Sequence, residues 1–124
     1  MIERIRLLAL PLAGSRSAII GLMLVLNVIF NILANAGFKF SAMSPNWKGL
    51  LAWQVVGNLA GFLTVITLTG LLKHTPLHVA FPLTTGLAII GVQLVAAKFL
   101  FHETITTTQW LGTLLIVGGI FLLR

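Results

Sequence analysis

Long hydrophobic stretches alternate with short polar connections along the whole chain. Four of the stretches are long enough to cross a bilayer as helices, which takes roughly 17 to 25 residues. They cover about residues 17–40, 49–72, 79–101 and 107–123. The connections SAMSPNWK, KHTPLH and HETITT hold the prolines and clustered polar residues typical of helix ends. Because backbone groups in hydrocarbon must pair within their own segment, we predict an all-α membrane protein, a bundle of four transmembrane helices.

The first 16 residues combine charges with a short apolar run, MIERIRLLALPLAGSR. Signal peptides have a similar pattern, but no clear cleavage site follows and a full-length span begins at once. We therefore expect residues 1–16 to be a cytoplasmic or interfacial segment, with a short interfacial stretch that ends near Pro11. Residues 17–124 would form the transmembrane domain.

The composition supports a membrane location. The chain is 58% hydrophobic and 8% charged, with a mean hydropathy of +1.08, whereas soluble domains keep about a quarter of their residues charged. Its net charge of +6 comes from basic residues spread thinly between apolar stretches. Because a nucleic-acid-binding protein gathers such residues on one face, we expect no nucleic acid partner. The absence of cysteine excludes disulfides and thiolate sites.

Lysine and arginine mark the cytoplasmic side of a membrane protein. On the side of the two termini lie Arg4, Arg6, Arg16, Lys73 and Arg124. On the opposite side lie Lys39, Lys48 and Lys98. The excess predicts cytoplasmic termini, although so small a difference also allows a homodimer whose copies insert in opposite orientations.

Polar residues recur every fourth position in the first span, at Asn27, Asn31, Asn35 and Lys39. A four-residue step turns a helix by about 40°, so these side chains share one face. An asparagine facing lipid would leave its amide unpaired, so we expect this face to point inward. The amides could simply hold a neighbouring helix, at about 0.6 to 2 kcal/mol each. We favour a hydrated groove that faces a ligand, because three amides in register with a lysine exceed what helix association needs.

The second span repeats the four-residue step at Gln54 and Asn58, and we place these two residues on the opposite wall of the groove. Its Gly57 and Gly61 form a GxxxG pair that allows close approach of another helix. Packing within the bundle and a subunit interface are both possible uses of this pair. In the third span, Pro82 removes a backbone donor and indicates either a hinge or an ordinary kink.

Charged residues end the third span at Lys98 and Glu103, on the same membrane side as Lys39. Glu103 is the only acid outside the N-terminal segment, so it is the natural counter-ion for one of these lysines. The simpler interpretation is a structural salt bridge at the membrane–water interface, with the lysine side chains extending to water. The alternative is that Lys39 and Lys98 bind an anionic group, a phosphate in particular.

An enzyme is the function class that fits least. The sequence has no Ser-His-Asp set and no paired carboxylates. Two loop histidines, His74 and His78, have no acids or thiols beside them to complete a metal site. We expect no metal and no cofactor. What remains is a transporter or an accessory subunit, and four helices enclose so little volume that a transporter would pair with a second copy or a paralogue, in antiparallel orientation.

The run HETITTTQWLGTLLIVGGIFLL resembles the end of the drug/metabolite transporter superfamily. The four-span layout is similar to the small multidrug resistance-like and EamA-like members. By this resemblance, Gly112 and Gly119 in the last helix would form a dimer interface. The multidrug proteins need a glutamate in the first span, where Asn31 stands here, so a proton-exchanging site for cationic drugs is missing. Phe81 matches an aromatic position of the third span, but Thr84 stands where a tryptophan is expected.

A closer resemblance, over about residues 25–124, is to small flippase subunits for undecaprenyl-phosphate-linked aminoarabinose. It rests on the Ala80-Phe81-Pro82 entry to the third span, on KFLFHE at its end, and on Asn35 followed by Lys39. The resemblance implies a polar lipid as substrate, with amides at its head group and lysines at its phosphate.

The sequence thus predicts half of a dimeric inner-membrane transporter, a homodimer or a heterodimer with a paralogous four-span subunit. Its substrate would be a polyprenyl-phosphate-linked sugar or a similar polar lipid. The residues expected at the head group are Asn27, Asn31, Asn35, Gln54, Asn58, Phe81 and Thr84, with Lys39 and Lys98 at the phosphate and Glu103 organising these lysines. Two alternatives stay open, a small multidrug or metabolite exporter and a non-transporting accessory subunit.

Overall fold

The computed structural model describes the backbone of residues 2–122 and the side chains of residues 16–122. Over this part of the chain the protein is helical, without strands, which confirms the predicted all-α class. The helices are α1 (Ile2–Met43), α2 (Trp47–Leu72), α3 (Leu77–Gly91), the π-helix η1 (Val92–Leu100) that continues α3, and α4 (Thr107–Leu122).

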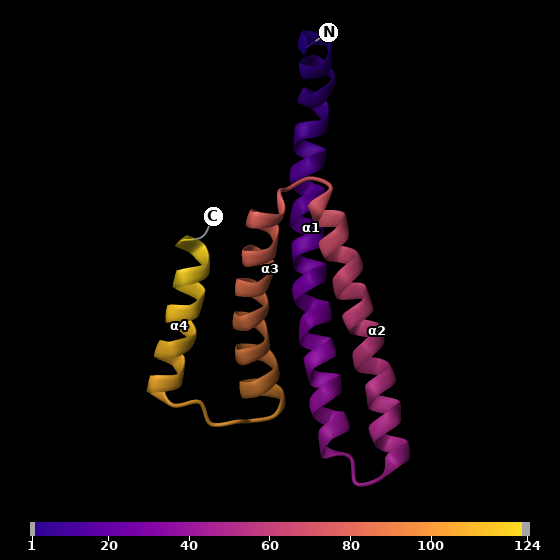
Figure 1. The fold of residues 1–124 in the computed structure, drawn as a ribbon, viewed down its shortest axis with the longest axis vertical. Helices are drawn as coiled ribbons and strands as arrows, with labels where there is room; N and C mark the ends of the chain where they lie inside the picture. The colour runs from indigo at the N-terminus through magenta and orange to yellow at the C-terminus, as the bar shows by residue number, and fades with distance from the viewer. Residues whose placement is uncertain (1, 123–124) are drawn as a thin grey trace.

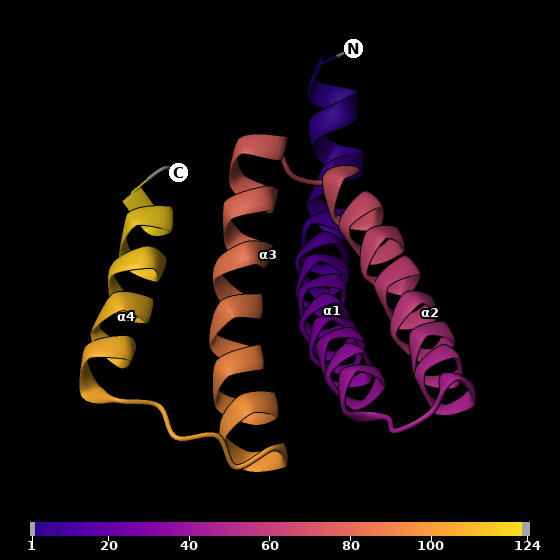
Figure 2. The ribbon, with the colours of Figure 1, turned by 60° about the horizontal axis from the view of Figure 1, so that its bottom comes forward.

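Successive helices run in opposite directions, with α1 between α2 and α3 (Figure 1). The first part of α1 extends beyond the ends of the other helices (Figure 1). Figure 2 shows from a second direction that α4 lies on the side of α3 that faces away from α1. Among the described residues, α4 packs against the continuous helix formed by α3 and η1, and not against α1 or α2. The core of the bundle is therefore α1, α2 and α3, and α4 is a peripheral element.

Three segments are long and apolar enough to cross a membrane, namely Arg16–Met43, Trp47–Leu72 and Leu77–Leu100. The fourth apolar helix begins where the sequence predicts it, but α4 has 16 residues. At 1.5 Å per residue it spans about 24 Å, less than the roughly 30 Å of a hydrocarbon core. Four helices are thus confirmed, and three of them have the length of a full span.

The helix α1 runs without interruption through Pro11, where we expected the first segment to end. A proline inside a helix removes a backbone hydrogen bond and crowds the preceding turn, which can kink a helix without ending it. The proposed boundary between residues 16 and 17 lies inside this continuous helix and stays a prediction.

The closest helix contact joins α1 and α2 at two facing glycines. A Cβ added to Gly37 would lie 3.0 Å from Gly57 Cα, and a Cβ added to Gly57 would lie 3.2 Å from the backbone oxygen of Ala34. Gly57 therefore serves packing within the bundle, which is one of the two uses considered for the GxxxG pair. A Cβ on Gly61 would meet nothing within 4 Å, so the partner of Gly57 in this contact is Gly37.

An aromatic cluster fixes the end of the bundle where α1 turns into α2. The ring of Phe40 stacks on Trp53 with centroids 4.7 Å apart and meets Phe101, after η1, at 4.9 Å. Beside it, the Ser41 hydroxyl donates to the backbone oxygen of Leu50 at 2.8 Å. These contacts hold α1, α2 and the end of η1 together. They fix which faces of the three helices point toward one another at this end of the bundle.

We expect Gly37→Leu to destabilise the protein by about 1–3 kcal/mol, because its side chain would have to separate the α1 and α2 backbones. Gly21→Leu is the matched control on the same helix, since a Cβ there meets nothing within 4 Å. The measurement is the free energy of unfolding from SDS titration in mixed micelles. Equal stability of the two variants would contradict the close contact.

Candidate functional site

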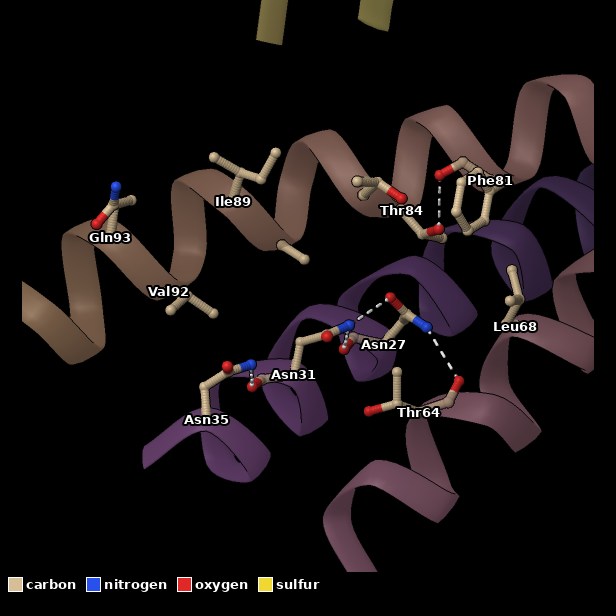
Figure 3. Close-up of a pocket in the computed structure, with 12 residues that line it drawn as sticks. Asn27, Asn31, Asn35, Thr64, Leu68, Phe81, Thr84, Ile89, Val92 and Gln93 are labelled. Atoms are coloured by element: carbon tan, nitrogen blue, oxygen red, sulfur yellow. Dashed lines mark hydrogen bonds between the residues drawn. The ribbon is translucent and has the colours of Figure 1, made fainter. Parts of the chain in front are cut away.

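A cavity of about 450 Å³ lies between α1, α2 and α3. Figure 3 shows the asparagines of α1 facing the polar and aromatic side chains of α3 across it. The lining residues are Asn27, Asn31, Asn35, Thr64, Leu68, Phe81, Thr84, Thr85, Ala88, Ile89, Val92 and Gln93. None of them is charged, so the cavity is neutral, with amides and hydroxyls set in a lining surface that is mostly apolar.

Helical periodicity explains why these residues meet. On α1 the asparagines recur at four-residue steps, which places them on one side of the helix. On α3 the lining positions recur at three- or four-residue steps from Phe81 to Val92, which again selects one face. The cavity therefore lies between two continuous helix faces, with Thr64 and Leu68 of α2 beside them.

Asn27 joins α1 to α2. Its side chain is 1% exposed, and its Nδ2 donates to the Thr64 backbone oxygen and to Thr67 Oγ1, both at 3.1 Å. The Thr67 hydroxyl in turn donates to the Thr64 oxygen at 2.8 Å. At this position the helix-holding interpretation of the asparagines applies.

The other two asparagines emerge progressively from the contact between α1 and α2. Asn31 is half-buried, and its Nδ2 donates to the backbone oxygen and to Oδ1 of Asn27, both at 3.0 Å. Asn35 is exposed, and its Nδ2 donates to the Asn31 backbone oxygen at 2.8 Å. We call Asn27, Asn31 and Asn35 the amide ladder.

The hydrogen bonds of the ladder decide which atoms are left for a ligand. A backbone carbonyl only accepts, so Asn31 and Asn35 must turn their NH₂ groups toward the preceding turn. Within the described part of the chain, Asn31 Oδ1 and Asn35 Oδ1 have no donor. The open part of the ladder therefore offers two amide oxygens as acceptors and the second N–H of Asn35 as a donor, a neutral set that suits hydroxyl groups better than an anion.

The α3 wall combines a buried hydroxyl with an exposed ring. Thr84 is 5% exposed, and its hydroxyl donates to the backbone oxygens of Ala80 and Phe81 at 2.9 and 3.1 Å. Its proton is thus occupied, and the oxygen lone pairs remain as acceptors. Phe81 is 57% exposed, so it forms an apolar rim where the cavity opens to the outside.

Two residues that we placed on the opposite wall lie elsewhere. Gln54 Nε2 donates to Ser41 Oγ at 3.2 Å, and Asn58 Nδ2 donates to the Gln54 backbone oxygen at 2.7 Å. Neither lines the cavity, whose α2 wall is Thr64 and Leu68. Gln54 lies at the height of Ser41, beyond the end of the cavity. Asn58 follows Gly57, at the height of Ala34, but it is exposed on a face of α2 that does not border the cavity.

The charged residues also lie outside this cavity. Lys39 and Lys98 are exposed, near the ends of α1 and η1 that Figure 1 shows at the same end of the bundle. Glu103 is exposed too, and within the described residues it forms no ion pair with either lysine. The expected pairing of Glu103 with a lysine is therefore absent from this structure. Glu103 lines a separate cavity between η1 and α4.

Sequence reasoning did not assign Thr64, Leu68 or Gln93 to the cavity. Thr64 satisfies its own hydroxyl by donating to the Ala60 backbone oxygen at 3.1 Å, a common arrangement in membrane helices that gives no functional signal. Gln93 was noticeable as a polar residue in an apolar span, and it continues the four-residue step of Thr85 and Ile89.

The two glycines predicted at a dimer interface are open. A Cβ added to Gly112 or to Gly119 would meet nothing within 4 Å. Both belong to α4, the helix with a single helix neighbour in the described chain. Their use in dimer formation stays a prediction.

Comparison with known proteins gives two informative relatives. One, from Pseudomonas fluorescens (strain Pf0-1), is 32% identical over 80 residues, which is 64% of this chain and 67% of the relative. Another, from Escherichia coli O157:H7 (strain EC4115), is 30% identical over 84 residues, or 68% of this chain and 74% of the relative. Each is named "Probable 4-amino-4-deoxy-L-arabinose-phosphoundecaprenol flippase subunit ArnE".

The chain belongs to the ArnE family. Together with its three span-length helices, this membership makes it a multi-pass membrane protein of the flippase type. The relatives are named as parts of a transport system and not as enzymes. No family model matches the chain, and no solved structure matches it. The resemblance to ArnE-type subunits that the third span and the asparagines indicated is confirmed.

We expect Asn27→Ala to lower the free energy of unfolding by about 0.6–1.7 kcal/mol for each interhelical hydrogen bond lost. Asn35→Ala should change it by less than about 0.5 kcal/mol, because Asn35 is exposed and bonds only to its own helix. SDS titration in mixed micelles measures both. A larger loss at Asn35 than at Asn27 would show that the ladder does not hold α1 to α2.

Proposed function

We propose that this protein is one subunit of an inner-membrane flippase that moves a polyprenyl-phosphate-linked sugar across the bilayer. The observation that carries the proposal is a neutral, acceptor-rich cavity formed by three helices of span length. The names of the relatives support the choice of a phosphoundecaprenol-linked aminosugar as substrate. The chemistry of the cavity supports placing the sugar inside it.

A sugar fits the cavity because its hydroxyl groups donate hydrogen bonds. Asn31 Oδ1, Asn35 Oδ1 and the Thr84 oxygen are the acceptors that the helices leave available. Binding pockets for small molecules commonly enclose 300–1,000 Å³, and about 450 Å³ is available here. The exposed ring of Phe81 lies at the end of the cavity away from the lysines, where it would contact an apolar face of the sugar.

The phosphate would lie outside the cavity, near Lys39 and Lys98. Acceptor oxygens repel an anion, whereas an exposed ammonium binds a phosphate as a point charge. Lys39 follows Asn35 by one four-residue step, about 6 Å along α1. A head group with its sugar against Asn35 would thus place its phosphate at the cationic end of the bundle.

A second subunit would complete the path. The relatives are named as subunits, and α4 has most of its surface uncovered by the rest of the described chain. We assign this role to a second copy or to a paralogous four-span protein, packed through Gly112 and Gly119. The distribution of lysine and arginine supports cytoplasmic termini.

The direct test is lipid movement in proteoliposomes that contain the chain together with any four-span protein that co-purifies with it. The probe is undecaprenyl phosphate linked to 4-amino-4-deoxyarabinose, initially in the inner leaflet. Its arrival in the outer leaflet is measured with external periodate, which cleaves vicinal hydroxyls. Movement above that in protein-free liposomes is expected, and its absence would refute the proposal.

We expect Asn35→Leu to lower the rate of lipid movement at least tenfold, because it replaces an acceptor of the cavity with an apolar group. The control is Thr69→Leu, which changes an exposed polar residue of α2 that lines neither large cavity and should leave the rate unchanged. If Asn31→Leu and Lys39→Ala also leave the rate unchanged while disturbing assembly, the protein is an accessory subunit.

A small multidrug or metabolite exporter is the second candidate. The acceptor oxygens that suit a sugar would also accept a cationic molecule. No acidic residue lines the cavity, so proton exchange would need a different site. Saturable uptake of a cationic dye coupled to protons, without lipid movement, would favour this candidate.

A further inference from the structure

A second cavity of about 450 Å³ lies between η1 and α4. Its polar lining comes from Gln93 of η1, from Glu103 and Thr104 of the following loop, and from Gln109 and Thr113 of α4. The proposed function gives this cavity no role. It differs from the first cavity because it contains a carboxylate.

Gln93 lines both cavities. It is the second residue of η1 (Val92–Leu100), where the chain winds as a π-helix. Such turns are rare and frequently occur at functional sites. The two cavities therefore adjoin at the Gln93 side chain.

The hydrogen bonds around Thr113 orient the Gln93 amide. The Thr113 hydroxyl donates its single proton to the Gln109 backbone oxygen at 3.0 Å, so it can only accept from Gln93. Gln93 Nε2 fills that position at 3.4 Å. Gln93 Oε1 has no donor among the described residues and remains available as an acceptor.

The backbone around Glu103 is anchored, which places its carboxylate at this cavity. His102 has a φ of 53°, in the left-handed region, so the chain turns sharply after η1. The Glu103 amide then donates to the Ala97 backbone oxygen at 2.8 Å. No described cation pairs with the Glu103 side chain. An ionised carboxylate and an amide oxygen both accept hydrogen bonds, and together they complement a cationic donor.

We propose that the second cavity binds the protonated amine of an aminosugar head group, with Glu103 as the counter-charge and Gln93 Oε1 as a further acceptor. This inference rests on the proposed function, since it takes the sugar to occupy the first cavity. The amine would then reach past Gln93 toward Glu103, while the phosphate stays near the lysines. Glu103 would thereby select aminosugar lipids over those with only hydroxyl groups.

The test compares two short-chain prenyl phosphates, one linked to 4-amino-4-deoxyarabinose and the other to arabinose. Their dissociation constants are measured by calorimetry on the purified protein, together with any subunit that co-purifies. We expect wild type to bind the amino compound at least tenfold more tightly, a difference of about 1.4 kcal/mol. Glu103→Gln should remove this preference without changing the affinity for the arabinose compound, and Glu103→Asp should keep part of it.

Each outcome either supports or refutes the amine site. If wild type binds both compounds equally, or if Glu103→Gln weakens both by the same factor, the amine site is refuted and the proposed function is unaffected. If neither compound binds, the proposed function fails and this inference fails with it. Thermal unfolding of Glu103→Gln shows whether a loss of affinity arises from misfolding. If it does, the preference of Glu103→Asp for the amino compound tests the amine site instead.

Discussion

A primary amide buried between membrane helices has to find hydrogen-bond partners there, because neither lipid nor water supplies them. Asn27 meets this constraint by donating to Thr64 and Thr67 of α2. Every buried side-chain polar atom in the described part of the chain has a partner. The bonds of Asn27 fix the rotation of α1 about its axis, and with it the direction of the whole amide ladder.

The rotation of the ladder produces the cavity. Each four-residue step turns by about 40°, so a ladder that begins in the contact between α1 and α2 must emerge from it within two steps. Asn31 is half-buried and Asn35 is exposed, as this geometry requires. The close glycine contact of Gly37 and Gly57 keeps α1 against α2, so the space beside the ladder opens toward α3. One set of residues thus serves stability at one end and, in the proposed function, would bind the sugar at the other.

The sequence predicts well those features that depend on one helix alone. Hydropathy locates the helices, and the four-residue step places the asparagines on one face of α1. Features that depend on how two helices pack are harder to predict from the sequence. Gln54 and Asn58 show the same step as the ladder, but whether they border the cavity depends on the height and rotation of α2, which the contact of Gly37 with Gly57 fixes.

Local winding limits prediction in the same way. An ordinary α-helix through residue 101 is what the sequence predicts, so it does not reveal the π-winding after Gly91. That Gln93 borders a second cavity depends on the packing of α4, which the sequence does not show. The separation of Glu103 from the lysines was also hidden. The residue before Glu103, His102, has a left-handed conformation that histidine adopts only occasionally, so the direction of the chain at Glu103 was not predictable.

The length of the ladder sets a limit on what a single chain can do. From Asn27 to Asn35 the ladder rises about 12 Å, less than half of the roughly 30 Å of hydrocarbon. Before Asn27, residues 18–26 of α1 are all apolar or glycine. A sugar carried along the ladder would thus stop near the bilayer midplane. A second protomer inserted in the opposite orientation would place its own ladder in the other leaflet. The two ladders together would then reach both membrane surfaces.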